Sequence, residues 1–261
     1  MLRSLHIAST GMDAQQRKLD VTSNNLANVN TTGFKRGRAE FQDLLYQTIK
    51  APGEATGQGV ESPTGIQTGL GVRHVATSRD FAQGSLKNTA NVLDLAVEGN
   101  GFFQVTRPNG EIAYTRAGNF GRDAQGRVVN PDGLPIEPQI VLPPDTLSMN
   151  ISADGIVSVT QAGQTQATEV GQIQLANFIN PSGLRALGRN LLSQTNASGT
   201  AVVGNPGDTG LGTLAQGFLE TANVSVVDEM VNLITGQRTY EANSKIISAS
   251  DEMLRSAVQL R

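Results

Sequence analysis

The stretch NNLANVNTTGFKR, Asn24 to Arg36, marks the point where the chain changes character. Residues before it follow a helical spacing, whereas residues after it follow strand patterns. Asparagine is a middling helix former and glycine a poor one, and asparagine and threonine side chains bind nearby backbone groups and can end a helix. Gly33 permits a positive φ as the chain leaves the helix. The stretch therefore predicts the end of an N-terminal helix, with Phe34 anchoring the exit.

Seven-residue spacing of apolar side chains occurs at both ends of the chain. Near the N-terminus it joins Leu5, Met12, Leu19 and Leu26. Near the C-terminus it joins Val226, Leu233, Tyr240, Ile247 and Leu254, and Met230 extends the same face. No proline follows Pro206, so a long C-terminal helix is expected. Because each helix carries an apolar stripe, we expect the two to pair as a coiled-coil stalk.

The middle of the chain, from about residue 71 to 217, has the pattern of short strands joined by tight turns. The run GFFQVTRPNGEIAYTRAGNF contains two β-type segments around Asn109-Gly110, and further turn signals are Asp132-Gly133 and Asp154-Gly155. Frequent turns predict a sandwich or small barrel. The predicted fold class is therefore α+β: a discontinuous helical coiled-coil stalk from both termini, with a mostly β domain inserted between them.

These patterns divide the chain into four parts. They are an N-terminal stalk helix in residues 1–45, an extended segment in 46–70, a β domain in 71–217 and a C-terminal stalk helix in 218–261. The extended segment is rich in Gly, Pro, Ser, Thr and Gln. Its composition fits either a flexible linker or a segment that becomes ordered only against a partner.

Composition excludes several classes of function. The 261 residues include no cysteine, which excludes disulfides, thiolate nucleophiles and cysteine-ligated metals. A formal net charge of −3 gives no basic excess for nucleic acid. The N-terminus lacks the apolar core of a cleavable signal peptide, and no run of ~18 apolar residues is present. We expect no nucleic-acid partner and no direct membrane insertion.

No arrangement typical of catalysis or metal binding appears. His6 and His74 lie in different segments without a spaced carboxylate, and the run SADGIVSV around Asp154 lacks the later carboxylates of a calcium loop. The paired acids of the C-terminal run, such as Asp228 and Glu229, fit solvated or intersubunit charges. We therefore expect no catalytic residue, no cofactor and no metal site, and we do not expect an enzyme.

The stalk is expected to be incomplete in one chain. Its stripes are narrow, and its other faces carry Val, Ile and Ala rather than many charges, so we infer that it folds fully when copies lie side by side. The asparagines at its base could satisfy backbone groups of crowded neighbours, or could form a polar cap and turn within one chain. The predicted assembly interface comprises Leu5, Met12, Leu19, Asn25, Leu26, Asn28, Asn30, Gly33, Phe34, Val226, Met230, Leu233, Tyr240, Ile247 and Leu254. Lys35, Arg36 and Arg38 are expected to face solvent or acidic neighbours.

Two long motifs carry a resemblance to a known family. SNNLANVNTTGFKR, residues 23–36, resembles the N-terminal signature of bacterial flagellar axial proteins of the rod and hook, and residues 219–254 resemble their C-terminal signature. LDLAVEGNGFFQV from Leu93 and YTRAGNF from Tyr114 resemble their β domain. Within the family, the length and the segment from YQTIKAPG to GVRHVAT point to the distal rod of the basal body.

The resemblance implies a structural subunit of a rigid, hollow drive shaft that carries torque from motor to hook. Terminal helices of the family form an inner coiled-coil tube, and the β domain forms an outer layer. The implied partners are further copies in a helical tube, proximal rod proteins, the hook protein and the surrounding ring proteins. The implied location is the basal body across the periplasm, reached through the flagellar secretion apparatus without a cleaved signal. Residues 46–70 are implied to pack between subunits and stiffen the shaft.

Three alternatives stay open at this point. A proximal rod or hook protein of the same family is the nearest. A secreted module that binds the cell wall is less favoured, because the β region has no tryptophan and few aromatic residues for stacking on sugars. A wall-cleaving hydrolase lacks a convincing pair of carboxylates.

Overall fold

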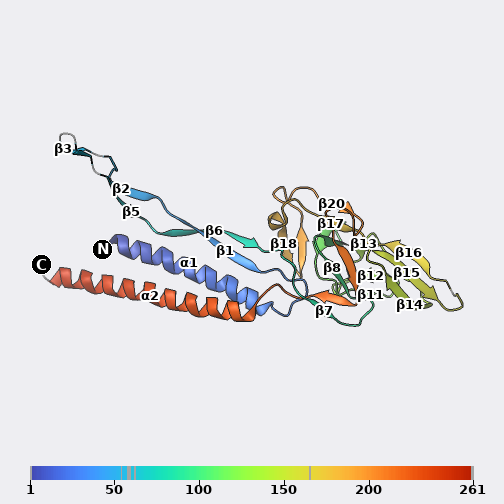
Figure 1. Ribbon diagram of the computed structural model, residues 1–261. Coiled ribbons are helices and arrows are strands. Elements are labelled where there is room, and N and C mark those ends of the chain that lie inside the picture. The colour runs from blue at the N-terminus through green and yellow to red at the C-terminus, as the bar shows by residue number, and fades with distance from the viewer. Residues whose placement is uncertain (1, 54, 58–59, 62, 165, 260–261) are drawn as a thin grey trace. The chain divides into compact units, whose positions relative to one another are not determined.

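The computed structural model describes residues 2–53, 55–57, 60–61, 63–164 and 166–259 as two terminal helices with strands between them (Figure 1). The chain forms two compact units. The helical unit comprises Met1–Ala27, Gly37–Ser78 and Ser225–Arg261, and the β unit comprises Asn28–Arg36 and Arg79–Val224. The predicted α+β class, with a mostly β region inserted between terminal helices, is confirmed. The predicted boundaries of the four parts stay predictions.

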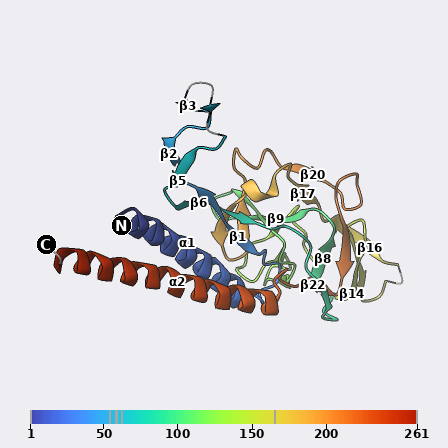
Figure 2. The same ribbon diagram turned by 60° about the vertical axis from the view of Figure 1, so that its left-hand side comes forward.

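The helical unit is built on an antiparallel helix pair, α1 (Leu2–Ala27) and α2 (Val226–Gln259), which lie side by side in Figures 1 and 2. The α2 helix begins after Ser225, whose Oγ accepts a hydrogen bond from the backbone N–H of Asp228 at 3.4 Å. Asp228 and Glu229 lie in its first turn, where negative charge is favourable near the helix dipole. The sequence spacing and the helix ends thus account for where α2 starts.

A two-stranded ribbon accompanies the helix pair. Its strands are β1 (Gly37–Asp43), β2 (Tyr46–Lys50), β3 (Ala55–Gly57), β4 (Val60–Glu61), β5 (Ile66–Gly69) and β6 (Val72–Arg79). They pair as β1 with β6, β2 with β5 and β3 with β4. Figures 1 and 2 show the ribbon alongside α1 over β1 and β6, and turned away from α1 over β2 and β5. Part of the 46–70 segment is therefore an antiparallel ribbon.

The β unit contains the remaining strands and a short 3-10 helix. They are β7 (Leu86–Asn88), β8 (Leu95–Glu98), β9 (Phe102–Thr106), β10 (Ile112–Thr115), β11 (Gly121–Arg122), β12 (Val128–Val129), β13 (Ile136–Glu137), β14 (Thr146–Ile151), β15 (Ile156–Gln161), β16 (Thr168–Gln172), β17 (Leu175–Asn177), η1 (Pro181–Gly183), β18 (Arg185–Gly188), β19 (Leu191–Ser193), β20 (Val202–Gly204), β21 (Thr213–Gln216) and β22 (Phe218–Glu220). Its largest sheet is 7-stranded, in the order β18-β19-β10-β9-β17-β20, with β13 also paired to β9. Strands β14, β15 and β16 form a separate 3-stranded sheet.

Glycines at positive φ close the predicted turns of this unit. Gly110 has a φ of 81°, and its N–H donates to the carbonyl of Arg107 at 2.9 Å. Gly133 and Gly155 repeat this arrangement with φ values of 79° and 82°. Residues with a Cβ disfavour that conformation, so glycine fixes each hairpin. The three turn predictions are confirmed.

The 7-stranded sheet is buried on both faces at its central strand β9. Neighbouring residues of β9 point to opposite sides: Phe103 joins the main core, while Phe102 joins a smaller cluster with Tyr114 and Phe178. In the main core Phe103 is fully buried, and its ring packs edge to face against the ring of Phe120, with 5.1 Å between the ring centroids. This two-sided burial explains why β9 carries apolar residues at adjacent positions, Phe102 and Phe103, rather than only at alternate ones.

Replacing Phe103 with alanine is expected to destabilise the protein by roughly 3–5 kcal/mol, because it removes a buried ring and leaves a cavity. Urea unfolding of the full chain measures this loss. The matched control is Ile112→Ala on the exposed side of β10, which we expect to change stability by less than about 0.5 kcal/mol. Equal effects of the two substitutions would contradict the placement of the core.

Candidate functional site

The seam between α1 and α2 is made largely of small and polar residues. On α2 the residues that face α1 are seven apart: Glu229, Gly236, Asn243 and Ser250. A Cβ built on Gly236 would lie 2.9 Å from Cδ2 of Leu19, and one built on Gly11 would lie 3.0 Å from Nδ2 of Asn243. The helices therefore approach closely at these two glycines. Apolar residues flank this row, and Leu233, Ile247 and Leu254, each four residues after one of its members, are half-buried.

Asn25 connects three segments at the base of the helix pair. Its Oδ1 accepts the backbone N–H of Gly37 at 2.8 Å, and its Nδ2 donates to the carbonyl of Gly37 at 2.9 Å. The same Nδ2 lies 3.5 Å from Oε1 of Glu229 on α2. Asn25 and Glu229 are both buried. One amide thus fixes the end of α1, the start of β1 and the start of α2.

The turn that follows α1 belongs to the β unit and is also closed within the chain. Thr31 donates its N–H to the carbonyl of Asn28 at 3.0 Å and its hydroxyl to Oδ1 of Asn28 at 3.1 Å. Gly33 has a φ of 69°, and a Cβ there would lie 2.6 Å from the backbone nitrogen of Ala117. Only glycine suits both constraints. The alternative of a polar cap and turn within one chain is thus realised at Asn28 and Thr31.

A buried ion cluster lies next to this turn in the β unit. Glu220 receives a hydrogen bond from Nζ of Lys35 at 2.6 Å and lies 3.4 Å from Nε of Arg116. All three side chains are at least nine-tenths buried. Burial lowers the pKa of Lys35, and attraction to Glu220 opposes that shift only in part. Lys35 therefore contacts an acidic residue of its own chain, Glu220, rather than solvent. Of the two environments expected for Lys35, the acidic neighbour is the one found.

Backbone groups complete the cluster. Lys35 also donates to the carbonyl of Ala82 at 2.8 Å, and the N–H of Gly84 donates to Oε1 of Glu220 at 2.9 Å. Arg116 donates to the carbonyls of Gly101 and Gly99 at 2.8 and 2.7 Å. Burial lowers the pKa of Arg116 too, against attraction to Glu220. The cluster ties the exit from α1 to β22, the strand that leads toward α2.

The outer face of α2 is apolar and exposed. Val227, Met230, Val231 and Ile234 follow the i, i+3, i+4, i+7 spacing of one helix face, and their exposed fractions are 70%, 51%, 57% and 52%. We call these four residues the α2 patch. Val231 lies two residues from Glu229, which is about 200° of rotation at 3.6 residues per turn. The α2 patch therefore lies on the side of α2 opposite the seam.

The predicted interface residues fall into two groups in the structure. Half-buried or buried are Leu5, Met12, Leu19, Asn25, Leu26, Asn28, Gly33, Phe34, Leu233, Ile247 and Leu254. Exposed are Asn30, Val226, Met230 and Tyr240. Their assignment to an interface between copies stays a prediction. Apolar spacing does not reveal the seam row from Glu229 to Ser250, because its members are small or polar, although they show the same seven-residue spacing.

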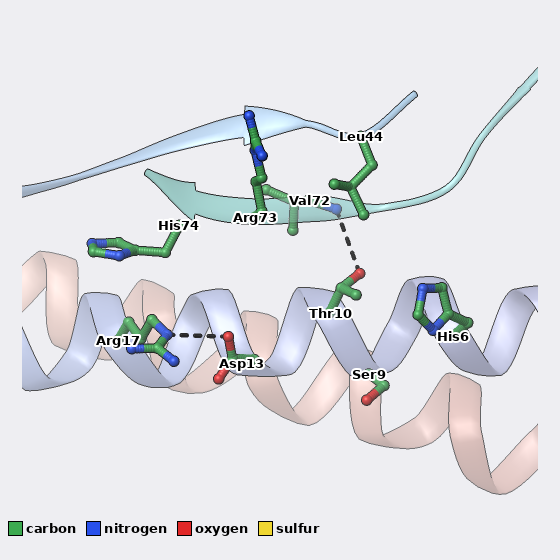
Figure 3. A pocket seen from close by; sticks show the side chains of 9 residues that line it. All are labelled: His6, Ser9, Thr10, Asp13, Arg17, Leu44, Val72, Arg73 and His74. Atoms are coloured by element: carbon green, nitrogen blue, oxygen red, sulfur yellow. Dashed lines mark hydrogen bonds and ion pairs between the residues drawn. The ribbon is translucent and has the colours of Figure 1, made fainter. Parts of the chain in front are cut away.

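A groove of about 630 Å³ lies in the helical unit between α1 and β6 (Figure 3). Its lining residues are His6, Ser9, Thr10, Asp13, Arg17, Leu44, Val72, Arg73 and His74. Arg17 pairs with Asp13 at 3.1 Å, and the N–H of Val72 donates to Oγ1 of Thr10 at 3.4 Å. Figure 3 shows His6 and His74 at opposite ends, so they do not act as a pair.

The described residues contain neither a metal-binding cluster nor a membrane-spanning helix. Within residues 2–53, 55–57, 60–61, 63–164 and 166–259, no group of three or more His, Asp or Glu side chains could hold a metal ion. Over the same ranges, neither helix combines the length and the apolarity needed to cross a bilayer.

Three family models match the chain. Residues 5–35 match the model described as flagella basal body rod protein, residues 96–159 match the flagellar hook protein FlgE/F/G D1 domain, and residues 215–260 match the flagellar basal body rod FlgEFG protein C-terminal region. The first and last matches cover most of α1 and α2, and the second lies within the β unit.

Full-length relatives show the same likeness. The chain is 51% identical over 260 residues to the flagellar basal-body rod protein FlgG of Buchnera aphidicola from Schizaphis graminum, and 50% identical over 260 residues to that from Acyrthosiphon pisum. It is 49% identical over 261 residues to FlgG of Caulobacter vibrioides. Each comparison covers 100% of this chain and 100% of the relative.

Replacing Asn25 with leucine is expected to lower stability by about 1–3 kcal/mol, because both backbone groups of Gly37 lose their partner inside the helical unit. Hydrogen exchange at the Gly37 amide should quicken markedly. Asn30→Leu is the control, since Asn30 is exposed and the change should leave that amide unaltered. Unchanged exchange at Gly37 in the Asn25 variant would show that the amide does not hold β1.

Replacing Glu220 with glutamine is expected to destabilise the β unit by roughly 3–5 kcal/mol, because two buried cations lose their shared carboxylate. Thermal or urea unfolding followed by the near-ultraviolet circular dichroism of the tyrosines and phenylalanines measures the effect. Glu111→Gln removes an exposed ion pair with Arg107 and should cost no more than about 1 kcal/mol. A Glu220 variant as stable as the Glu111 variant would contradict the role given to the cluster.

Proposed function

The chain belongs to the flagellar basal-body rod protein family, and from this premise we propose that it is a structural subunit of the distal rod. Copies assemble into a rigid, hollow helical tube that transmits torque from the motor to the hook. The chain is 51% and 49% identical to two FlgG relatives over the whole of both chains. This similarity supports a place in the distal rod over other positions in the axial structure.

The observation that carries this proposal is the α2 patch. Four large apolar side chains follow one exposed face of a helix whose opposite face is already occupied by α1. Full burial of each such side chain is worth about 1.5–3 kcal/mol. Exposed apolar surface of this extent on one face marks an interaction site. In an assembly of identical chains, the natural cover for this face is the helix pair of a neighbouring copy.

The seam of the helix pair supports the same proposal from the inside. Gly11, Gly236 and Asn243 let the helices approach closely. The apolar residues Leu233, Ile247 and Leu254 beside this row stay only half-buried in one chain. Helices in proteins gain most of their stability from tertiary packing of an apolar face. The α1–α2 pair therefore needs further packing on the outside of α2, and the terminal helices become fully stable when copies surround them.

The ribbon of the helical unit is a second contact surface in this proposal. Leu45, Tyr46, Ile49 and Ile66 on or beside β2 and β5 are exposed. Residues 46–70 thus carry apolar side chains outward, which suits packing between subunits better than a free linker. Such contacts add lateral stiffness to the shaft. We include the further predicted residues, Asn25 and Leu26 of the helical unit and Asn28 to Phe34 of the β unit, in the interface between copies.

The remaining properties follow from a structural role. The protein acts through rigid contacts and needs no catalytic group, cofactor or metal. Its partners are further copies, proximal rod proteins, the hook protein and the surrounding ring proteins. It occupies the basal body across the periplasm and is exported by the flagellar secretion apparatus without a cleaved signal.

A proximal rod or hook protein is the second candidate, because the family model for residues 96–159 is shared by FlgE, FlgF and FlgG. Identity of 49–51% to FlgG over whole chains favours the distal rod. Complementation of strains that lack each rod or hook protein separates the candidates. Restored motility in only the strain that lacks the distal rod protein is the expected result.

The double substitution Met230→Asp and Val231→Asp should abolish polymerisation of the purified protein, because it places charge on the face that a neighbouring copy covers. Electron microscopy of the unmodified protein should show tubes, and the variant should show none while its far-ultraviolet circular dichroism at low concentration stays unchanged. The double substitution Gln237→Asp and Ser244→Asp, which adds the same two charges at exposed polar positions of α2, should still give tubes. Tubes formed by the double variant would contradict the proposal.

A further inference from the structure

The smaller apolar cluster of the β unit is open on one side. A cavity of about 220 Å³ lies beside it, with Phe81, Phe102, Phe178 and Pro181 as apolar walls, and Arg116 also lines it. Ile179 forms part of the rim and is 87% exposed. Small-molecule sites usually measure about 300–1,000 Å³. The cavity is thus closer in size to one or two protein side chains than to a cofactor.

The guanidinium group in this cavity is poorly neutralised. Glu220 is the one carboxylate that pairs with Arg116 in the described part of the chain, and it lies nearer to Lys35, at 2.6 Å against 3.4 Å. Oε2 of Glu220, the oxygen that faces Arg116, accepts no hydrogen bond within those residues. Exposed Asp80 attracts Lys35 weakly. Two buried cations thus share one carboxylate, and a second anion beside Arg116 would be favourable.

A ligand for this cavity should contact the apolar walls and also neutralise the charge of Arg116. A carboxylate that comes with an aliphatic side chain satisfies both features, since the side chain contacts the phenylalanine rings and the carboxylate pairs with the guanidinium. A neutral apolar group would leave the charge unchanged, and a free inorganic anion would leave the walls exposed to water.

The start of strand β14 of this same chain carries such a pair of groups. Asp145 directly precedes the strand and Leu147 lies within it, and both are exposed, with Leu147 at 74%. β14 is an edge strand, since its one partner among the described strands is β15. It can therefore approach another molecule without breaking its own sheet.

We propose that the cavity beside Arg116 receives Leu147 and Asp145 of a second copy, with Leu147 against the phenylalanine walls and the Asp145 carboxylate paired to Arg116. The contact rests on the proposed function. Cavity and edge strand are different surfaces of one chain, so the contact is head-to-tail. Head-to-tail contacts that do not close into a ring propagate a helical filament.

The ligand chemistry is tested on the full chain with N-acetyl-L-leucine as the probe and its uncharged amide as the matched control. Nuclear magnetic resonance should show saturable shifts of the Phe102 and Phe178 rings and of the Arg116 Nε–H with the carboxylate. The amide should bind at least tenfold more weakly. Absence of shifts, or equal binding of the two compounds, would overturn the assignment.

A rim substitution tests the site without touching the ion cluster, because Arg116→Gln would also free the carbonyls of Gly99 and Gly101. Ile179→Asp places a negative charge at the mouth of the cavity and should weaken probe binding at least tenfold. Ile112→Asp makes the same change at another exposed isoleucine of the β unit and should leave binding unaltered. Equal affinity in the two variants would count against the cavity.

The identity of the second copy is tested by cross-linking, for which the absence of cysteine in the sequence gives a clean background. The double variant Leu147→Cys and Ile179→Cys, assembled and treated with a short bis-maleimide, should give a ladder of trimers and longer products. Each single variant should give dimers at most. Tubes without a ladder would overturn this contact and leave the proposed function standing. Failure of the unmodified protein to form tubes would contradict the proposed function and the second copy as occupant, whereas probe binding reports on the cavity alone.

Discussion

The arrangement of the helical unit depends on a seam where a row of small and polar residues of α2 faces α1, while apolar residues of α2 stay half-buried or exposed. Glu229, Gly236 and Asn243 face α1, which sets the register and the short distance between the helices. Because that row faces α1, Val227, Val231 and Ile234 lie on the exposed outer side of α2. The terminal helices of one chain thus form a defined pair with unfinished packing. We propose that the apolar face left exposed on this pair is the surface through which copies join.

A second constraint lies within the β unit, where the segment that follows α1 is bound to the strand that precedes α2. Lys35, shortly after α1, and Glu220, shortly before α2, share a hydrogen bond at 2.6 Å inside the β unit. Removing two charges from water is expensive unless the geometry is good, so such pairs fix position more than they add stability. The cluster therefore sets where the chain leaves and re-enters the β unit. Its surplus positive charge at Arg116 also gives the neighbouring cavity its preference for a carboxylate.

Some of these features can be predicted from the sequence, and others cannot. Seven-residue spacing predicted both helices, and Asn-Gly and Asp-Gly pairs predicted hairpin turns, because both depend on local geometry. The row from Glu229 to Ser250 was missed because small and polar residues at a helix seam have no apolar signal. Lys35 was expected to face solvent or acidic neighbours, and its partner Glu220 lies 185 residues away, beyond any local pattern. The paired amide contacts of Asn25 with Gly37 were hidden for a similar reason, since a turn separates them.

The central claim is that α2 becomes fully stable only when neighbouring copies cover its outer face. Hydrogen exchange measured by mass spectrometry on α2 peptides, in dilute monomer and in assembled tubes, tests it most directly. The account predicts fast exchange of α2 amides in the monomer and strong protection in the tubes, with β9 and β10 equally protected in both. Strong and equal protection of α2 in dilute monomer and tubes would contradict it.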